Sequence, residues 1–564
     1  MKSIRTLSVG VSAIAVALLM VLSTGGASAA TEVNYQNPVT AAPPPAVPPT
    51  PSCAVTLVTN FPFGTNGYDT PATGTISPPS GCPGPWAAVI LNFTGSVQGV
   101  QFDREAEIWV GNVLIYYGTT PEPDPHGITW TVLKDVTEYS PVFAQSEPFA
   151  IHLPNVVDST YTGVEYITAS LTFYQATASY PAPSNIPNVI LPLTDQANWV
   201  FDAGVTPVSM APFTLPANTV SLNLELWAKG NSCDEFWYAS EPTSYAQANG
   251  LCSGGAFREV LVFIDGTLAG AVFPFPYIFT GGVNPLLWRP IPAVDAFNEP
   301  AYYVDLTPFV GQLVNGEPHT ISLEVVNNGF YWQLGGNLLV NVDSGQSQTT
   351  GALTTYSILP GALNSTTQTI GKKAATFDFS ASRNYTIAGY VDTSMGKVTT
   401  TVTSNQSFTS HQVLNLVSFT ENLAGSETAR TTVSVVTPTA TTVTTTTDTY
   451  PIGMSSAFAI PQGAYNPNSN PSTVRFLLPA GVSQAWERQV TVTVNGVTVF
   501  SSSFSDSVRA SAVLEESLIT GQVGVATGSD SENYVYSDST GVCFHHVLAG
   551  SQGYVTQNTY LKHC

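Results

Sequence analysis

Short apolar runs, separated by polar and turn-forming residues, recur along most of the chain. These runs are rich in Val, Ile, Thr, Phe and Tyr and are separated by Gly, Pro, Asn and Ser. Such runs predict β-strands, whereas no long segment has the spacing of an amphipathic helix. Many short strands without helices between them predict an all-β fold of antiparallel sandwiches or barrels. The clearest strand candidates are residues 86–93, 107–117, 167–174, 220–227, 259–264 and 489–500.

The first 30 residues have the features of a signal peptide. Lys2 and Arg5 precede an apolar run, which ends at an Ala-Ser-Ala cleavage site at 27–29. A membrane anchor is the alternative, but the run is short for a bilayer span and ends in small residues. We therefore expect residues 1–30 to be removed, which would leave a secreted protein without a membrane partner.

The rest of the chain divides by composition into a spacer and three β-rich domains. Residues 31–52 form a Pro-rich N-terminal segment, and a second Pro-punctuated stretch separates two sandwich candidates. We predict the first domain at 53–185, the second at 186–350 and a C-terminal β-rich domain at 351–564. Within the last, the Thr- and Val-rich run 435–447 is interpreted as a strand with a hydroxyl-bearing face, and a glycosylated linker is the alternative.

Six cysteines agree with an oxidising compartment. They allow fifteen pairings among which the sequence does not choose, and we favour pairing of nearest neighbours. Those pairs are Cys53 with Cys82, Cys233 with Cys252, and Cys543 with Cys564. No metal site is expected, because no Cys-x-x-Cys or His-x-x-x-His spacing occurs and His545, His546 and His563 have no ligand set around them.

Charge is scarce and strongly acidic. Only 10% of residues are charged, with 16 Lys and Arg against 38 Asp and Glu, for a net charge of −22. A surface so poor in bases argues against nucleic acid and anionic membranes as partners. At low pH the protonated chain carries few positive charges that repel one another, so the composition favours work below about pH 5. An ordinary acidic extracellular protein is the alternative.

Two segments concentrate charge in a chain that otherwise avoids it. The first, residues 102–110, is read as a strand with Asp103, Glu105, Glu107 and Trp109 on one face. The plain interpretation is a solvated acidic face of a sandwich strand. Arg104 disturbs this interpretation, because an arginine on the core side requires a carboxylate partner.

The second segment, residues 233–238, reads Cys-Asp-Glu-Phe-Trp-Tyr. Its cysteine can pin the loop, and its aromatic rings can stack on the C–H faces of a sugar while carboxylates accept hydroxyl hydrogen bonds. A carboxylate pair drawn from the two segments can also perform acid–base hydrolysis. An acidic and aromatic loop that only binds sugar is the alternative.

Several segments in one order resemble the peptide-N-glycanase A family of acidic glycoamidases and, more distantly, the bacterial enzyme PNGase F. The resemblance runs from about residue 82 to residue 326, and nothing as specific covers the chain after about residue 350. The matching segments are residues 102–104, 119–123, 127–130, 134–137, 158–163, 234–238, 258–260, 274–276, 281–290 and 305–309.

The resemblance implies two jelly-roll sandwiches with an active site between them. Asp103 matches the aspartate of a Trp-Asp-Arg strand, and Glu235 matches the glutamate of a Cys-Ala-Glu-Trp-Cys loop, so both are expected to be catalytic. A third acidic position falls near Asn155 and Asp158, where this chain departs from the pattern. Arg289 matches an arginine in a Trp- and Pro-rich loop.

The resemblance further implies hydrolysis of the amide that joins asparagine to the first N-acetylglucosamine, in N-glycosylated peptides or proteins, without a cofactor. Asp103 would act at the scissile bond, and Glu235 would orient water or protonate the leaving nitrogen. Arg104 or Arg289 would stabilise the oxyanion and lower the pKa of a carboxylate, and Trp237 would contact sugar. The alternatives are a lectin-like jelly roll without activity and a glycosidase with carboxylates about 5 to 10 Å apart.

Overall fold

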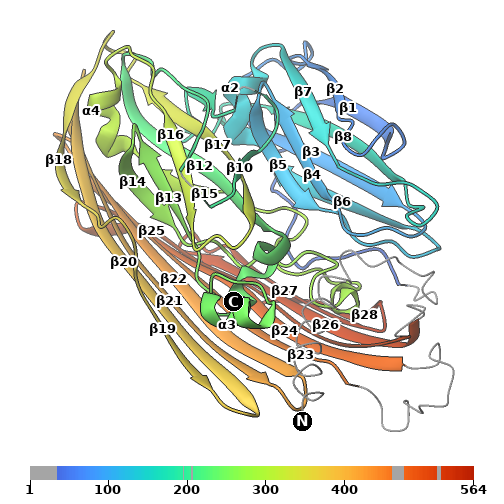
Figure 1. Ribbon diagram of the computed structural model, residues 1–564. Helices are drawn as coiled ribbons and strands as arrows, with labels where there is room; N and C mark the ends of the chain where they lie inside the picture. Colours follow the sequence, from blue (N-terminus) through green and yellow to red (C-terminus); the bar gives the residue numbers. More distant parts are fainter. Residues whose placement is uncertain (1–34, 195, 205–206, 460–474, 518–522) are drawn as a thin grey trace, which may run out of the picture.

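The computed structural model describes residues 35–194, 196–204, 207–459, 475–517 and 523–564. It confirms the all-β prediction: the described chain forms two β-sandwiches and one long sheet, and its helices are short (Figure 1). The predicted signal peptide at 1–30 lies outside the described residues. Across the described ranges, no helix is long and apolar enough to cross a membrane.

The first sandwich is a jelly roll of eight strands. Its sheets have the orders β1-β8-β3-β6 and β2-β7-β4-β5, the interleaving that two Greek keys produce. Alternation decides which face is buried, as in β8, where Ile167, Ala169, Leu171 and Phe173 all point into the core. The elements are β1 (Ser52–Phe63), β2 (Ala72–Ile76), β3 (Trp86–Val97), β4 (Glu105–Val110), β5 (Val113–Thr119), β6 (Ile128–Asp135), η1 (Thr137–Tyr139), α2 (Ser140–Phe143), β7 (Glu147–His152) and β8 (Glu165–Gln175).

The second sandwich repeats this topology. Its sheets have the orders β10-β17-β12-β15 and β11-β16-β13-β14, and β9 also pairs with β17. Its elements are β9 (Val189–Pro192), β10 (Val200–Asp202), β11 (Val208–Ser209), β12 (Thr219–Asn231), η2 (Ser232–Ala239), α3 (Thr243–Asn249), β13 (Glu259–Ile264), β14 (Thr267–Val272), η3 (Pro285–Trp288), β15 (Tyr302–Asp305), η4 (Thr307–Phe309), α4 (Val310–Leu313), β16 (Ile321–Val326) and β17 (Tyr331–Val342).

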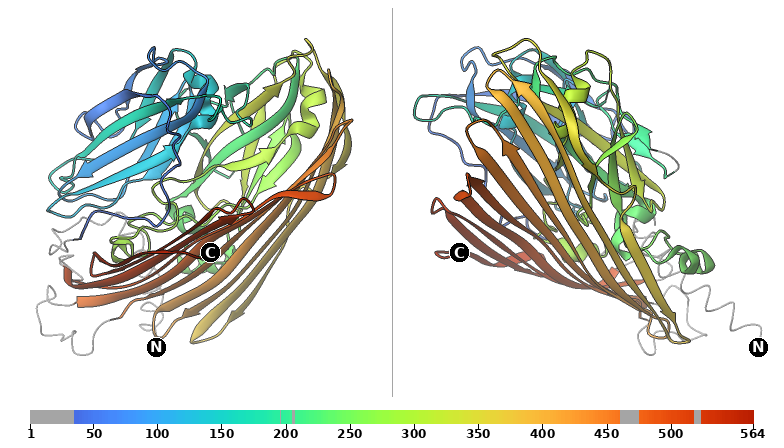
Figure 2. Two further views of the ribbon diagram at one scale, coloured as in Figure 1. Left: turned by 180° about the vertical axis from the view of Figure 1, so that it is seen from behind. Right: turned by 90° about the vertical axis from the view of Figure 1, so that its left-hand side faces the viewer.

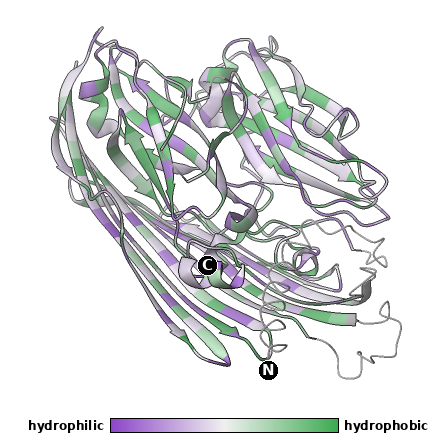
Figure 3. Ribbon diagram, viewed as in Figure 1, coloured by the Kyte–Doolittle hydropathy of each residue, from purple (hydrophilic) through white to green (hydrophobic). Residues whose placement is uncertain are grey.

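The C-terminal unit is one long antiparallel sheet of eleven strands. Figure 2 shows it curving beneath the two sandwiches, and Figure 3 shows apolar and polar residues alternating along its strands. Phe377, Phe408, Tyr450 and Trp486 on its inner face belong to the same hydrophobic core as the second sandwich. Its strands are β18 (Thr350–Ser357), β19 (Leu363–Ile370), β20 (Ala374–Thr393), β21 (Gly396–Asn415), β22 (Thr420–Val436), β23 (Thr441–Ala457), β24 (Arg475–Val494), β25 (Val497–Ser517), β26 (Val523–Asp538), β27 (Cys543–Ser551) and β28 (Tyr554–Leu561).

Three predicted strands are hairpins in the structure. Residues 107–117 turn at Gly111 and Asn112, whose φ angles are 56° and 64°, and residues 489–500 turn at Asn495 and Gly496. These pairs favour the positive φ of a two-residue hairpin turn, so the chain reverses there. The Thr-rich run 435–447 forms strand as predicted, but it crosses the turn between β22 and β23.

The disulfide pairing of nearest neighbours is confirmed. The Cα–Cα distances are 5.8 Å for Cys53–Cys82, 5.2 Å for Cys233–Cys252 and 5.9 Å for Cys543–Cys564. The second of these bridges closes the loop that begins at η2, the element that carries the predicted acidic residues.

Aromatic residues from both sandwiches form a shared core where the sandwiches meet. Trp109 and Tyr117 of the first pack edge-on against Trp199 of the second, with ring centroids 5.8 and 5.0 Å apart. Asn337 on β17 donates a hydrogen bond of 2.9 Å to the carbonyl of Leu114 on β5. This interface fixes the two sandwiches relative to each other, and so fixes any site built from both.

The C-terminal sheet holds the loops of the second sandwich in place. Arg383 on β20 forms a buried bidentate ion pair with Glu259 on β13. Gln484 on β24 donates to the carbonyl of Pro276 and accepts from the amide of Val294, which brackets the long loop before β15. The sheet therefore supports the loop that supplies one wall of the candidate site.

Candidate active site

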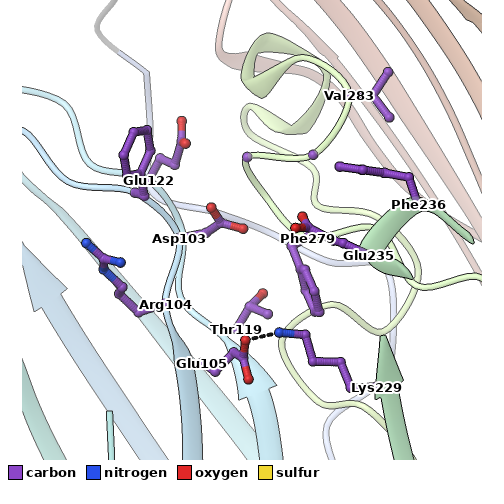
Figure 4. Close-up of a pocket in the computed structure, with 13 residues that line it drawn as sticks. Asp103, Arg104, Glu105, Thr119, Glu122, Lys229, Glu235, Phe236, Phe279 and Val283 are labelled. Atoms are coloured by element: carbon purple, nitrogen blue, oxygen red, sulfur yellow. Dashed lines mark hydrogen bonds and ion pairs between the residues drawn. The ribbon is translucent and has the colours of Figure 1, made fainter. Parts of the chain in front are cut away.

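A polar cavity of about 170 Å³ lies between the two sandwiches. Figure 4 shows Asp103 and Glu235 pointing toward each other across this cavity. Asp103 belongs to the first sandwich and Glu235 to the second. The cavity is lined by Phe102, Asp103, Arg104, Glu105, Thr119, Glu122, Lys229, Glu235, Phe236, Phe279, Gly281, Gly282 and Val283. The two predicted catalytic residues are thus brought together, although 132 positions separate them in the sequence.

Asp103 lies just before β4 rather than within a strand. Thr120 fixes the backbone here, since its hydroxyl accepts the Arg104 amide at 2.9 Å and its own amide donates to the Arg104 carbonyl at 2.7 Å. Strand alternation therefore starts only at Glu105. The predicted solvated acidic face is wrong, because Glu107 is 3% exposed and accepts a hydrogen bond of 2.8 Å from Trp109.

Glu235 lies in η2, the short helix that follows β12. Asp234 before it forms a fully buried ion pair with Arg258, and its second oxygen accepts the amides of Gly329 at 2.7 Å and Phe330 at 2.9 Å. The Cys233–Cys252 disulfide ties the same helix to the loop behind it. Glu235 is thus presented to the cavity by a segment that is anchored on both sides.

Lys229, at the end of β12, is a cavity residue that the sequence analysis missed. It forms an ion pair with Glu105 across the sandwich interface, donates to Asn231 at 3.0 Å and lies 4.7 Å from the ring centroid of Phe279. Lysine is scarce in this chain, and its place on the buried end of a strand next to the acidic loop was the available signal.

Glu122 is a further carboxylate of the cavity, in addition to Asp103, Glu105 and Glu235. A Cβ atom built on Gly281 would lie 2.5 Å from Oδ1 of Asp103 and 2.7 Å from Oε1 of Glu122, so these two oxygens lie within about 5 Å of each other. Arg289 forms an ion pair with Glu122 at 3.1 Å, and its guanidinium lies 4.7 Å from the ring centroid of Tyr35. Residues 119–123 belong to the family resemblance, but the sequence alone assigns Glu122 no role.

Burial raises the pKa of the carboxyl groups of Asp103, Glu122 and Glu235. Desolvation raises the pKa of Glu235 to about 7, helped by repulsion from Asp103 and opposed by Lys229. Desolvation also raises the pKa of Glu122 to about 8, against the attraction of Arg289. The pKa of Asp103 is raised as well, but the backbone amide of Gly281, then Lys229 and Arg104, favour its ionised form. Asp103 therefore has more groups that stabilise its anion than Glu235 has.

Arg104 lines the cavity, but no carboxylate among the described residues forms the predicted hydrogen bond with it. It donates instead to the amide oxygens of Asn155, at 3.2 Å, and Gln101. Asn155 is fully buried and also donates to the carbonyls of Phe63 and Gly163, so it positions Arg104 from behind the cavity wall. The predicted lowering of a carboxylate pKa by arginine operates, but desolvation outweighs it at both Asp103 and Glu122.

The other predicted binding residues, Arg289, Trp237 and Asp158, lie in three different environments. Arg289 lies beside the cavity through its pair with Glu122. Trp237 is 4% exposed and packs against Phe408, whereas its neighbour Phe236 lines the cavity. Asp158 is exposed in a turn, where its Oδ1 accepts the amides of Thr160 and Tyr161, and it does not line the cavity.

The described residues contain no group of three or more His, Cys, Asp or Glu side chains placed to hold a metal ion. His545 and His546 accordingly have other partners: Asn533 lies 2.9 Å from the first and Asn558 lies 2.9 Å from the second. The chemistry available in the cavity is that of four carboxyl groups with Lys229 and Arg104, and Arg289 lies beside the cavity through its ion pair with Glu122.

Comparison with known proteins identifies related sequences. The family model described as peptide N-acetyl-beta-D-glucosaminyl asparaginase amidase A matches residues 41–358. A protein of almond (Prunus dulcis), named peptide-N4-(N-acetyl-beta-glucosaminyl)asparagine amidase A, is 34% identical over 375 residues. The match covers 63% of this chain and 65% of the almond protein, so about a third of that relative is not covered.

The solved structures that the chain matches include that of PNGase F, a glycosylasparaginase from Flavobacterium meningosepticum. It is 13% identical, and the match covers 52% of this chain and 96% of that one, with a TM-score of 0.35. PNGF-II is also 13% identical, with 52% and 66% of the two chains covered and a TM-score of 0.36.

Proposed function

The chain belongs to the peptide N-acetyl-beta-D-glucosaminyl asparaginase amidase A family, and we propose that it is a secreted glycoamidase. It would hydrolyse the amide between asparagine and the first N-acetylglucosamine of an N-glycan. The observation that carries this proposal is the pairing of Asp103 and Glu235, one from each sandwich, across one polar cavity. The family and this geometry support the proposal together.

Asp103 is proposed to activate the attacking water. A base must be available as an anion, and Asp103 has the backbone amide of Gly281, Lys229 and Arg104 to favour that form. The water oxygen bonds to the amide carbon while its proton passes to the Asp103 carboxylate. The amide oxygen gains negative charge as it becomes tetrahedral, and the cations that line the cavity, Lys229 and Arg104, can stabilise that charge.

Glu235 is proposed to protonate the leaving nitrogen. An amide nitrogen leaves poorly unless it receives a proton, and Glu235 carries one below its raised pKa of about 7. The carbon–nitrogen bond then breaks, which leaves aspartate in the peptide and a glycosylamine on the glycan. Water later converts the glycosylamine to the free sugar and ammonia, so no oxidant, metal or cofactor enters the balance.

We further propose that the enzyme works in acid. Burial raises the pKa of Glu107, Asp295 and Asp530 to about 7 and the pKa of Glu225 and Glu532 to about 8. The folded chain therefore binds more protons than the unfolded chain between about pH 4 and pH 8, so its stability falls as the pH rises through that range. The three disulfides support secretion, because such bridges persist in oxidising compartments.

The proposal is tested with a purified glycopeptide and mass spectrometry. An amidase leaves an aspartate without sugar, a glycosidase leaves at least one sugar on asparagine, and a lectin leaves the glycopeptide unchanged. Asp103→Asn and Glu235→Gln are each expected to abolish the aspartate product while the thermal unfolding midpoint stays close to that of the wild type. Near-normal turnover by either variant would remove that residue from the mechanism.

A further inference from the structure

Four aromatic side chains gather on the surface beside the cavity. Phe201 on β10 is 53% exposed and Phe330 before β17 is 55% exposed. The ring of Tyr331 lies between them, with centroids 6.0 Å from Phe201 and 5.4 Å from Phe330. Tyr68, in the loop between β1 and β2, is 60% exposed. We call these four residues the aromatic platform. Single exposed rings need no explanation, whereas a cluster of them marks a binding surface.

The platform is tied to the catalytic loop by one carboxylate. The Asp234 oxygen that accepts the amides of Gly329 and Phe330 belongs to the residue directly before Glu235. Phe201 is held beside these rings because β10 pairs with β17 and because Asn328 donates to the carbonyl of Asp202 at 3.0 Å. The rings of the second sandwich therefore have a fixed position relative to Glu235.

Tyr68 places the first sandwich on the opposite side of the same region. Its carbonyl accepts the Asn155 amide at 2.7 Å, and Asn155 accepts from Arg104, which lines the cavity. Desolvation raises the pKa of the Tyr331 hydroxyl, and repulsion from Tyr68 and then from Glu235 raises it further. The platform thus draws its residues from both sandwiches, as the cavity does.

We propose that the aromatic platform is a second carbohydrate subsite, which binds neutral sugars of the glycan beyond the first N-acetylglucosamine. This inference rests on the proposed function. Aromatic faces stack on the C–H faces of pyranose rings, and such contacts need no charge. The segments that form the platform, residues 64–71, 200–202 and 327–333, contain no lysine or arginine to attract an acidic sugar or an acidic peptide.

The test compares two glycopeptides with the same peptide, one with a complete neutral glycan and one trimmed to a single N-acetylglucosamine. Phe201→Ala and Phe330→Ala are each expected to raise KM for the complete glycan about three- to tenfold, with kcat unchanged. On the trimmed substrate kcat/KM is expected to stay within about twofold of the wild type. Tyr180→Ala, which removes a ring that is 43% exposed outside the platform, is the matched control and should change neither value.

Two outcomes would overturn the inference. An equal loss on both substrates would assign the platform to folding or to the cavity itself. A loss of kcat/KM that grows with the length of the peptide, while the glycan stays the same, would show that the platform binds the polypeptide and not the glycan. Titration of the free oligosaccharide into Glu235→Gln by calorimetry separates this inference from the amidase proposal, since it requires no turnover. Binding that is weakened by Phe330→Ala would support the platform even if no amide is cleaved, and binding that is unchanged would refute it.

Discussion

The substitution Gly281→Ala tests whether the carboxylates occupy the positions that the mechanism requires. The added Cβ would lie 2.5 Å from Asp103 Oδ1 and 2.7 Å from Glu122 Oε1, whereas ordinary contacts begin near 3.4 Å. Both carboxylates must therefore retreat by about 1 Å, and a displacement of that size at the reacting group costs about 100-fold in rate. The φ angle of Gly281 is one that alanine also adopts, so the backbone does not need to change.

We expect kcat/KM of Gly281→Ala to fall about 100-fold on a glycopeptide substrate, with a thermal midpoint near that of the wild type. The unfolding midpoint should change little because the displaced atoms are the ends of side chains beside a cavity. Gly361→Ala is the control, since a Cβ at Gly361 would meet nothing within 4 Å. If Gly281→Ala folds and keeps kcat/KM within about threefold of the wild type, the assignment of Asp103 to the scissile bond is refuted.

Three further predictions follow from the same contacts. The raised pKa of Glu235 predicts that kcat falls as the pH rises through about 7, because the proton donor is then ionised. A pH profile of kcat with no descending limb near 7 would contradict the role of Glu235 as the proton donor. Lys229→Met should lower kcat about 100-fold by removing a cation from the cavity, and unchanged kcat would show that Lys229 only joins the sandwiches. Arg383→Met should leave Glu259 buried without its ion-pair partner and lower the free energy of unfolding by about 3 to 5 kcal/mol, as measured by denaturant titration; a loss below about 1 kcal/mol would refute the structural role of this pair.

Much of the fold follows from short-range patterns in the sequence. Runs rich in β-branched and aromatic residues, bounded by turn residues, placed β3, β8, β12 and β13 where the structure has them. Turns were less visible: Asn495 and Gly496 reverse the chain inside one apolar run, and only their tolerance of positive φ marks the place. The long sheet was predicted only as β-rich, since register between strands depends on contacts along the whole chain.

The sequence predicted the site residues whose chemistry is unusual for this chain, and it did not predict those that reach the site through the three-dimensional arrangement of the sandwiches. Asp103 and Glu235 stand out as charges in a chain that avoids charge, and family resemblance joined them. Phe236 and Trp237 could not be told apart, because η2 is a short helix and the strand rule does not say which ring faces the cavity. Glu122 enters the site through its contacts with Gly281 and Arg289 of the second sandwich, which no local pattern encodes.

Hydrolysis of a glycopeptide in water enriched in heavy oxygen tests the central claim most directly. The account predicts a peptide product in which the former asparagine is an aspartate that carries one heavy oxygen, because the attacking water bonds to the amide carbon. Asp103→Asn should form none of this product. A peptide that keeps its asparagine and one N-acetylglucosamine, with heavy oxygen only in the released sugar, would show cleavage between sugars and would contradict the account.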